Sequence, residues 1–178
     1  MFQHQQRKQL PIPPRLLFEL VLDVPSYPQF LPWCKGARIN KRFNASFEAD
    51  LIVGAKNYLN KTFTSLVEYD EQTGVITSRA IRGPFSHMSS RWIITSLVDC
   101  SEMADCEQWS KEGHSPVKQV LQTGSDIDFK VEFGFHSRLM ENMLGSFFEV
   151  ACLRMVEAFE KRAFKLFRYK LCQDNDMR

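Results

Sequence analysis

The sequence lacks the long apolar runs of membrane-spanning proteins and the biased composition of fibrous or disordered ones. No run of about 18 apolar residues occurs, so we expect no transmembrane helix. Only eight glycines and eight prolines are present, which excludes collagen-like and low-complexity classes. Hydrophobic residues make up 44% of the chain, too many for a disordered protein. The 178 residues suit one globular domain, which we place at residues 1–170, with a polar tail at 171–178.

An excess of charge of one sign is also missing. The chain has 23 basic and 21 acidic residues, whereas a dedicated DNA-binding protein is usually strongly basic, so we predict no DNA partner. The five cysteines are odd in number and do not resemble a small disulfide scaffold, which favours a reducing compartment. Cys100, Cys106 and His114 match no familiar zinc spacing and lack a fourth ligand, so we predict no metal site.

Common catalytic motifs are absent from the sequence. It contains no nucleophile elbow, phosphate-binding loop, dinucleotide fingerprint or paired metal-ligating histidines. An enzyme would need an acid or base directed into a cleft. The carboxylates of the predicted strands alternate with apolar residues and are therefore expected to face solvent; they are Glu48, Asp50, Asp128 and Glu132. We therefore predict no catalytic residue and no cofactor, and we expect that the protein is not an enzyme.

The hydrophobic pattern predicts short helices near the N-terminus, followed by antiparallel strands. Residues 2–10 fit a first strand, residues 15–23 a short amphipathic helix, and residues 27–31 a helical turn. From residue 47 the period changes from 3.6 to 2, as in half-buried strands, and residues 127–135 alternate most clearly. The polar segment 99–117 is interpreted as a long loop or insertion.

A long amphipathic helix is predicted from Ser137, the expected N-cap, to about Arg168. Helices that are segregated from a run of antiparallel strands indicate an α+β fold. The simplest packing lays the long helix across the concave face of a curved sheet, which leaves a tunnel or cleft between them. The apolar stripe of the helix consists of Met140, Leu144, Phe147, Ala151, Met155 and Ala158.

The apolar residues allow two interpretations. Fifteen phenylalanines and a methionine-rich helix are typical of a well-packed core. They also suit the wall of a cavity for a flexible apolar ligand, because small residues such as Gly145 and Ala151 interrupt the large ones and leave room. Composition and periodicity leave both interpretations open.

Two motifs over a hundred residues apart give the sequence a specific resemblance. Residues 27–34, Tyr-Pro-Gln-Phe-Leu-Pro-Trp-Cys, resemble the Tyr-Pro-x-Phe-Leu-Pro-Trp-Cys motif of the START-like, coenzyme-Q-binding protein family. Residues 147–163 resemble the C-terminal helix of the same family, and the strand at 127–135 also fits. The resemblance covers about residues 3–170.

The resemblance implies a helix-grip fold, in which a curved antiparallel sheet of about seven strands wraps around the long C-terminal helix. It implies that the protein binds ubiquinone (coenzyme Q) or a late precursor as a ligand and acts as a non-enzymatic lipid chaperone in quinone biosynthesis and respiratory electron transport. The implied location is the matrix side of the mitochondrial inner membrane, although no presequence is visible. The implied partners are the peripheral membrane surface and complexes of quinone biosynthesis or respiration.

The predicted ligand-binding residues combine the motif with the apolar positions of the strands and of the long helix. They are Phe30, Leu31, Trp33, Phe47, Leu51, Phe63, Trp92, Phe129, Phe133, Met140, Leu144, Phe147, Phe148, Ala151 and Met155. A basic cluster at the helix end is predicted to contact anionic lipid head groups, although cations there also complement the helix dipole. This cluster consists of Lys161, Arg162, Lys165 and Arg168.

Two other functions stay open at this point. Bacterial relatives of similar sequence include a toxin-like protein that binds ribosomes, and the basic helix end would suit contact with RNA phosphate. Aromatase/cyclase enzymes are the second alternative on the same fold. Such an enzyme would need inward polar groups, which the strand pattern does not supply.

Overall fold

A computed structural model describes residues 1–54, 60–97, 124–136 and 138–176; in the last range it describes the side chains of residues 150–169 and of Cys172. The predicted insertion at 99–117, with Cys100, Cys106 and His114, lies outside the described residues. The elements are β1 (Phe2–Leu10), α1 (Pro14–Leu22), the 3-10 helix η1 (Val24–Gln29), β2 (Cys34–Arg42), β3 (Ser46–Val53), β4 (Lys61–Asp70), β5 (Val75–Arg82), β6 (Phe85–Ser96), β7 (Ser125–Phe135) and α4 (Arg138–Asp176).

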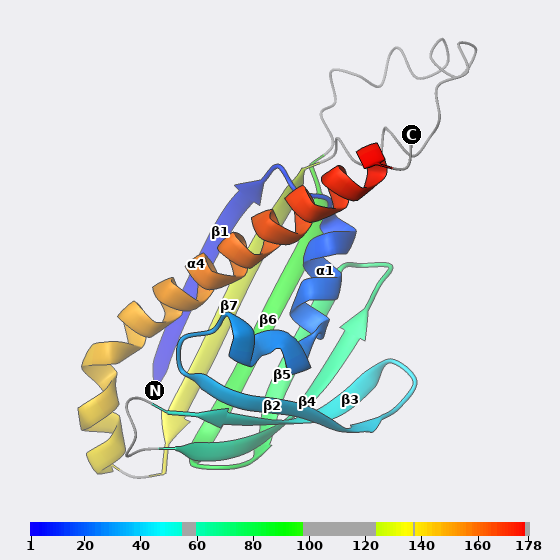
Figure 1. Ribbon diagram of the computed structural model, residues 1–178. Helices are drawn as coiled ribbons and strands as arrows, with labels where there is room; N and C mark the ends of the chain where they lie inside the picture. The colour runs from blue at the N-terminus through cyan, green and yellow to red at the C-terminus, as the bar shows by residue number, and fades with distance from the viewer. Residues whose placement is uncertain (55–59, 98–123, 137, 177–178) are drawn as a thin grey trace.

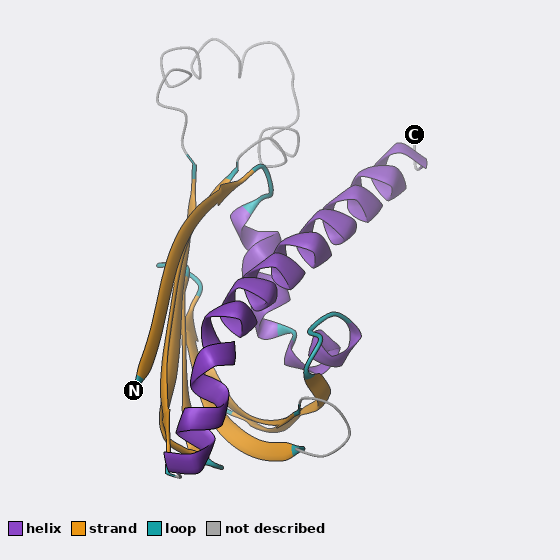
Figure 2. Ribbon diagram, turned by 90° about the vertical axis from the view of Figure 1, so that its left-hand side faces the viewer, coloured by secondary structure: helices purple, strands orange, loops and turns teal. Residues whose placement is uncertain are grey.

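The seven strands form one antiparallel sheet in the order β1-β7-β6-β5-β4-β3-β2. The long helix α4 crosses one face of this sheet (Figure 1). Figure 2 shows the sheet nearly edge-on, with α1, η1 and α4 all on the same side of it. This arrangement confirms the predicted α+β helix-grip fold. Among the described residues, no helix combines the length and the apolar character needed to span a bilayer.

Strand β7 shows how the alternating sequence gives the sheet one apolar face. Ile127, Phe129 and Val131 are buried in the core on the inner face. The acidic residues between them lie on the outer face, where Gln5 of β1 donates a hydrogen bond of 3.1 Å to Asp128. The strand predicted at 127–135 is thus confirmed, and its carboxylates lie on the outer face of the sheet.

An ion pair between Arg7 and Asp126 makes the attachment of the edge strand β1 sensitive to acid. Arg7 Nε donates to both Asp126 oxygens at 3.0 Å, and this hydrogen bonding holds the pKa of Asp126 below its usual range. The folded protein therefore binds this proton more weakly than the unfolded chain does. The stabilisation is complete above about pH 4 and is lost as the pH falls through the folded pKa.

We therefore expect Asp126→Asn to destabilise the protein at pH 7 and to have a smaller effect at pH 2.5. Urea unfolding of wild type and variant at both pH values measures the difference. An effect of equal size at the two pH values would contradict this assignment.

Helix α4 packs against the sheet along one narrow face. Cys152, Phe159 and Ala163 are buried there, whereas Val150 and Leu153 are 46% and 49% exposed. The centre of this face differs by about one residue from the predicted stripe. The stripe residues in this part of the helix are only half-buried; they are Ala151, Met155 and Ala158.

The end of α4 and the strand β2 both differ from the sequence prediction. The helix continues past Arg168 to Asp176, into the segment interpreted as a polar tail. Strand β2 is missing from the predicted elements because basic residues occupy much of it and most of its side chains are partly or fully exposed. Its pairing with β3 includes a hydrogen bond of 2.9 Å from Arg38 to Asp50.

Gly74 closes the turn between β4 and β5 in a backbone conformation that favours glycine. Its φ is +67°, and a Cβ atom there would lie 2.1 Å from the carbonyl oxygen of Ile94. Asp70 shapes the same turn by accepting a hydrogen bond of 2.9 Å from the backbone N–H of Gln72. Any side chain at this glycine would therefore strain the turn and move the neighbouring strand.

We expect Gly74→Ala to lower the free energy of unfolding by about 2 kcal/mol or more. The left-handed backbone conformation is strained for alanine, and the clash of its Cβ with the neighbouring strand raises the energy of the folded state further. Chemical denaturation measures this loss. Gly36→Ala is the matched control, since its Cβ would meet only the end of the Ile52 side chain, at 3.3 Å. A loss at Gly74 no larger than the loss at Gly36 would contradict the argument.

Candidate functional site

A cavity of about 330 Å³ lies between the inner face of the sheet and the helices η1 and α4. Strands β2 to β7 form its floor, and residues after η1 and on α4 form the opposite wall. Its volume is at the lower end of the range of about 300 to 1,000 Å³ that is typical of small-molecule sites. The cavity is therefore large enough for one ring with its substituents and a short chain.

Aromatic side chains gather at two places along the cavity wall. Trp92 packs against Phe129 with ring centroids 4.2 Å apart, and against Phe159 of α4 at 5.2 Å. Elsewhere on the floor, Phe63 of β4 and Phe85 of β6 are 5.2 Å apart in an edge-to-face arrangement. Aromatic rings supply a large apolar area with few rotatable bonds. Both places therefore offer a rigid surface to a ligand.

The Tyr-Pro-Gln-Phe-Leu-Pro-Trp-Cys motif at residues 27–34 builds the wall next to η1. Tyr27 donates its hydroxyl hydrogen to the backbone carbonyl of Val21, which fixes η1 against α1. Leu31 and Trp33 follow and line the cavity. The backbone N–H of Gly54 donates to the carbonyl of Trp33 at 3.0 Å, so the segment is also tied to the end of β3. The motif thus acts here as a structural wall.

The described lining of the cavity contains no carboxylate, lysine, arginine or histidine. Two weakly acidic side chains of this lining, Tyr27 and Cys34, are neutral near pH 7. Burial, assisted by Asp23, raises the pKa of the Tyr27 hydroxyl. Burial likewise raises the pKa of the Cys34 thiol, which contacts the carbonyl of Gly36 at 3.5 Å. The arrangement is suited to hold an apolar molecule.

The carboxylates of the strands lie on the outer face of the sheet, as the alternation predicted. Asp50 accepts hydrogen bonds from Thr64 at 2.7 Å and from Arg38 at 2.9 Å, and these bonds hold its pKa below the usual range. Lys130 lies 2.7 Å from Glu132 and lowers the pKa of that carboxylate in the same way. No group of three or more possible metal ligands occurs within the described ranges.

Most of the described residues that the sequence predicted as ligand-binding line this cavity. Phe30 and Phe47 do not: Phe30 packs against Tyr27 and Phe159 outside it, and Phe47 is 1% exposed in the core beside Tyr69. The side chains of Met140, Leu144, Phe147 and Phe148 lie outside the described residues. The predicted residues that line the cavity are Leu31, Trp33, Leu51, Phe63, Trp92, Phe129, Phe133, Ala151 and Met155.

Sequence reasoning missed several lining residues, among them three serines. Ser65, Ser78 and Ser90 all line the cavity on the inner face of the sheet. The signal was present, since Ser90 precedes Trp92 by two positions and therefore shares its face. The prediction left the serines out because it took only the motif and the apolar positions of the strands and of the long helix.

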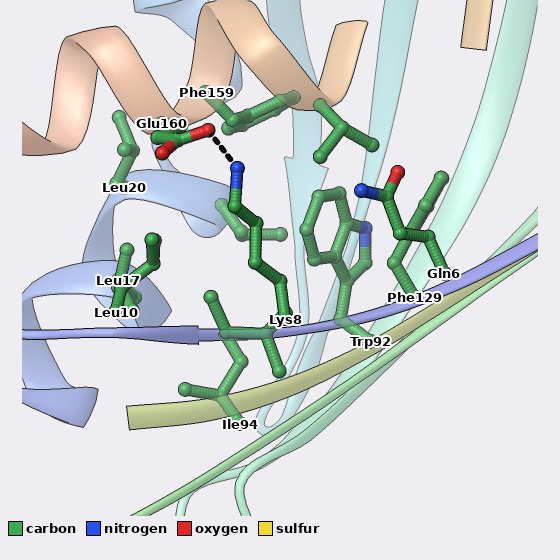
Figure 3. Close-up of a pocket in the computed structure, with 13 residues that line it drawn as sticks. Gln6, Lys8, Leu10, Leu17, Leu20, Trp92, Ile94, Phe129, Phe159 and Glu160 are labelled. Carbon is green, nitrogen blue, oxygen red and sulfur yellow. Dashed lines mark hydrogen bonds and ion pairs between the residues drawn. The ribbon is translucent and has the colours of Figure 1, made fainter. Parts of the chain in front are cut away.

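A second cavity, of about 30 Å³, lies between β1 and α4 (Figure 3). Lys8 and Glu160 form an ion pair at its edge and connect these two elements (Figure 3). Trp92 and Phe159 line both cavities. The smaller one has room for about one or two water molecules and is too small for a lipid.

The four residues of the predicted membrane contact differ in exposure. Lys161, Lys165 and Arg168 are exposed along α4, and Lys161 pairs with Glu157 at 2.6 Å. Arg162 instead turns toward η1: it donates to Gln29 at 3.0 Å, and its guanidinium lies 5.8 Å from the centre of the Phe30 ring. Contact between this cluster and a membrane stays a prediction.

Comparison with known proteins identifies a matching family, and the relatives include both a ribosome association toxin and a coenzyme Q-binding protein. Residues 10–160 match the model of a family described as polyketide cyclase / dehydrase and lipid transport. The chain is 33% identical over 165 residues to the ribosome association toxin RatA of Rickettsia prowazekii, an alignment that covers 92% of this chain and 97% of the relative. It is 27% identical over 143 residues to the mitochondrial coenzyme Q-binding protein COQ10 of Drosophila melanogaster, covering 80% of this chain and 50% of the relative.

Solved structures share the architecture. A START superfamily protein from Mycobacterium smegmatis superimposes with a TM-score of 0.60 at 19% identity, and the alignment covers 92% of this chain and 98% of that protein. At this level of identity the likeness concerns the fold alone.

Proposed function

The chain belongs to the polyketide cyclase / dehydrase and lipid transport family, and we propose that within this family it is a non-enzymatic protein that holds a lipid in its apolar cavity. The observation that carries the proposal is the cavity of about 330 Å³ between sheet and helices. Its walls are almost entirely apolar, and its described lining has no carboxylate, lysine, arginine or histidine. Because cyclase or dehydrase chemistry requires an acid or base within reach of the substrate, this lining supports a binding role over a catalytic one.

We further propose an isoprenoid quinone, ubiquinone or a late precursor, as the ligand. The motif at residues 27–34 and the relative named as coenzyme Q-binding support this choice. A planar ring fits beside the rigid aromatic surfaces around Trp92 and Phe85. We also propose a location at the matrix side of the mitochondrial inner membrane, with complexes of quinone biosynthesis or respiration as partners. Both proposals rest on that same relative, whereas the more similar RatA relative is bacterial.

Tryptophan fluorescence tests lipid binding directly, because Trp33 and Trp92 line the cavity. A Trp109→Phe background leaves these two as the only tryptophans of the chain. We expect decylubiquinone, a soluble short-chain quinone, to quench their emission with a saturable, one-site titration. Quenching that rises linearly without saturation would contradict the proposal.

Association with ribosomes is a second candidate function, favoured by one specific observation. The RatA relative has higher identity to this chain than the coenzyme Q-binding one and aligns over nearly its whole length. The comparisons thus support this function better than the coenzyme Q function. Lys165 and Arg168 are exposed cations of the predicted basic cluster on α4 and are placed to meet RNA phosphate, whereas Lys161 is exposed but pairs with Glu157.

Co-sedimentation with purified ribosomal subunits tests this second function. If α4 meets RNA, binding should weaken steeply between 50 and 200 mM salt and should fall in a Lys165→Glu, Arg168→Glu double variant. The matched control is Lys35→Glu with Lys41→Glu, which changes the charge equally on the exposed strand β2. Equal loss in both double variants would assign the effect to net charge and contradict a role for α4.

A further inference from the structure

We propose that Ser65, Ser78 and Ser90, here called the serine row, form a hydrogen-bonding subsite for the polar head of the ligand. The inference rests on the proposed lipid binding and adds the chemical class of the ligand. That class is a lipid whose ring carries carbonyl or hydroxyl oxygens, as opposed to a plain hydrocarbon.

The three serines lie on adjacent strands of the cavity floor, two of them directly opposite each other and the third offset by two residues. Ser78 of β5 is paired in register with Ser90 of β6, and their hydroxyl oxygens are 2.8 Å apart. Ser65 of β4 is paired with Ala80, two residues along β5 from Ser78, and therefore shares its face. All three line the cavity. The row thus places three hydroxyls on one patch of an otherwise mostly apolar floor.

The buried hydroxyl of Ser65 gives the strongest support for this subsite. This residue is 3% exposed, and its Oγ has no hydrogen-bond partner among the described residues. A buried hydroxyl without a partner costs free energy, and proteins usually satisfy such groups. Ser65 lines the cavity, so its hydroxyl would gain the missing partner if it rotates about χ1 toward a ligand oxygen.

The pair formed by Ser78 and Ser90 has unused capacity as well. Two hydroxyls carry two hydrogens, and the bond between them uses one of these. The second hydrogen and the remaining lone pairs are available to a ligand. The serine row can therefore donate to a carbonyl oxygen or accept from a hydroxyl.

The aromatic side chains on both sides of the serine row favour a ligand with a flat ring. On the inner face of β6, Ser90 lies between Met88 and Trp92. The Trp92–Phe129 pair therefore lies on one side of the row, and the aromatic group around Phe85 lies on the other. A conjugated ring bound here would have apolar rings at both ends and hydroxyls at its centre. Alanines would leave the same space, so the hydroxyls themselves are what the row adds.

Two ligands with the same decyl chain test the proposal: decylubiquinone, whose ring carries carbonyl and methoxy oxygens, and decylbenzene, whose ring carries no oxygen. Their affinities are measured by displacement of the fluorescent probe 1-anilinonaphthalene-8-sulfonate. We expect wild type to prefer the quinone by about 10-fold or more, and each serine-to-alanine change to weaken quinone binding by about 3- to 10-fold. Decylbenzene affinity should stay unchanged. The matched control is Ser89→Ala, on the same strand but outside the cavity.

Ser65→Ala gives a second, independent readout. Because it removes an unpartnered hydroxyl, the ligand-free variant should unfold at the same temperature as wild type or higher, while it binds the quinone less tightly. A destabilised variant with unchanged quinone affinity would overturn the proposal. The same holds if the wild type binds both ligands equally, which would leave lipid binding itself intact. If neither ligand binds, both the serine row and the proposed lipid function fail.

Discussion

Replacing Ala151 by tryptophan is expected to abolish lipid binding while the protein stays folded. Ala151 lies on α4, is half-buried and lines the cavity. An indole at this position would occupy part of the 330 Å³ that the ligand needs, without displacing well-packed core atoms. We expect a loss of affinity for decylubiquinone of about 100-fold or more, because the indole takes up cavity volume that the ligand needs.

The control for this change is Leu153→Trp, two positions along the same helix. Leu153 is 49% exposed and does not line the cavity. This variant should bind the quinone as wild type does. Circular dichroism verifies that both variants fold. A folded Ala151→Trp protein with wild-type affinity would contradict the assignment of the cavity as the ligand site.

The largest expected effect on stability follows from Phe47→Ala. The side chain is 1% exposed and packs beside Tyr69, at 6.3 Å between ring centres, with the Arg42 guanidinium 5.6 Å from its own ring centre. Removing a buried phenylalanine leaves a void that the surrounding core cannot fill completely. We expect a loss of about 3 to 5 kcal/mol in the free energy of unfolding, measured by urea denaturation.

Phe43→Ala is the matched comparison, since Phe43 is 44% exposed in the neighbouring turn. Its cost should stay below about 1 kcal/mol, as is usual for surface positions. Quinone affinity of the folded Phe47→Ala protein should equal that of wild type. If the variant loses quinone binding while its stability is unchanged, Phe47 belongs to the ligand site, as the sequence predicted.

The strands and the long helix were predictable where the periodicity was strong. The alternation at residues 127–135 and the helical spacing that follows identify β7 and α4, and together with the short N-terminal helices they indicate the α+β class. Strand β2 was not predictable, because most of its side chains are partly or fully exposed and its apolar residues therefore form no extended alternating pattern. Its position follows from pairing with β3, which is a long-range property.

The extent of the cavity along a strand was likewise beyond the sequence. Phe47 and Leu51 share the inner face of β3, yet only Leu51 lines the cavity. The reason lies elsewhere in the chain: Phe18 of α1 packs against Tyr69, and these side chains fill the space around Phe47. Periodicity assigns a residue to a face but does not report what covers that face.

The rotation of α4 about its axis was fixed by contacts that the stripe alone does not specify. Phe159 is enclosed by Tyr27, Phe30 and Trp92, at 5.3, 5.1 and 5.2 Å between ring centres. These contacts turn Cys152 and Phe159 inward and leave Ala151 at the margin, where it borders the cavity. Cys152 and Phe159 line the cavity together with the predicted Ala151 and Met155, so the rotation of the helix adds lining residues that the stripe did not predict.

Mass spectrometry of an organic extract from the natively purified protein tests the central claim most directly. We predict an isoprenoid lipid with an oxygen-bearing ring, close to one molecule per chain, and its absence from Ala151→Trp purified in the same way. An extract without lipid, from a protein that also takes up no decylubiquinone from micelles, would contradict lipid binding. Ribosome association would then stand as the function to pursue.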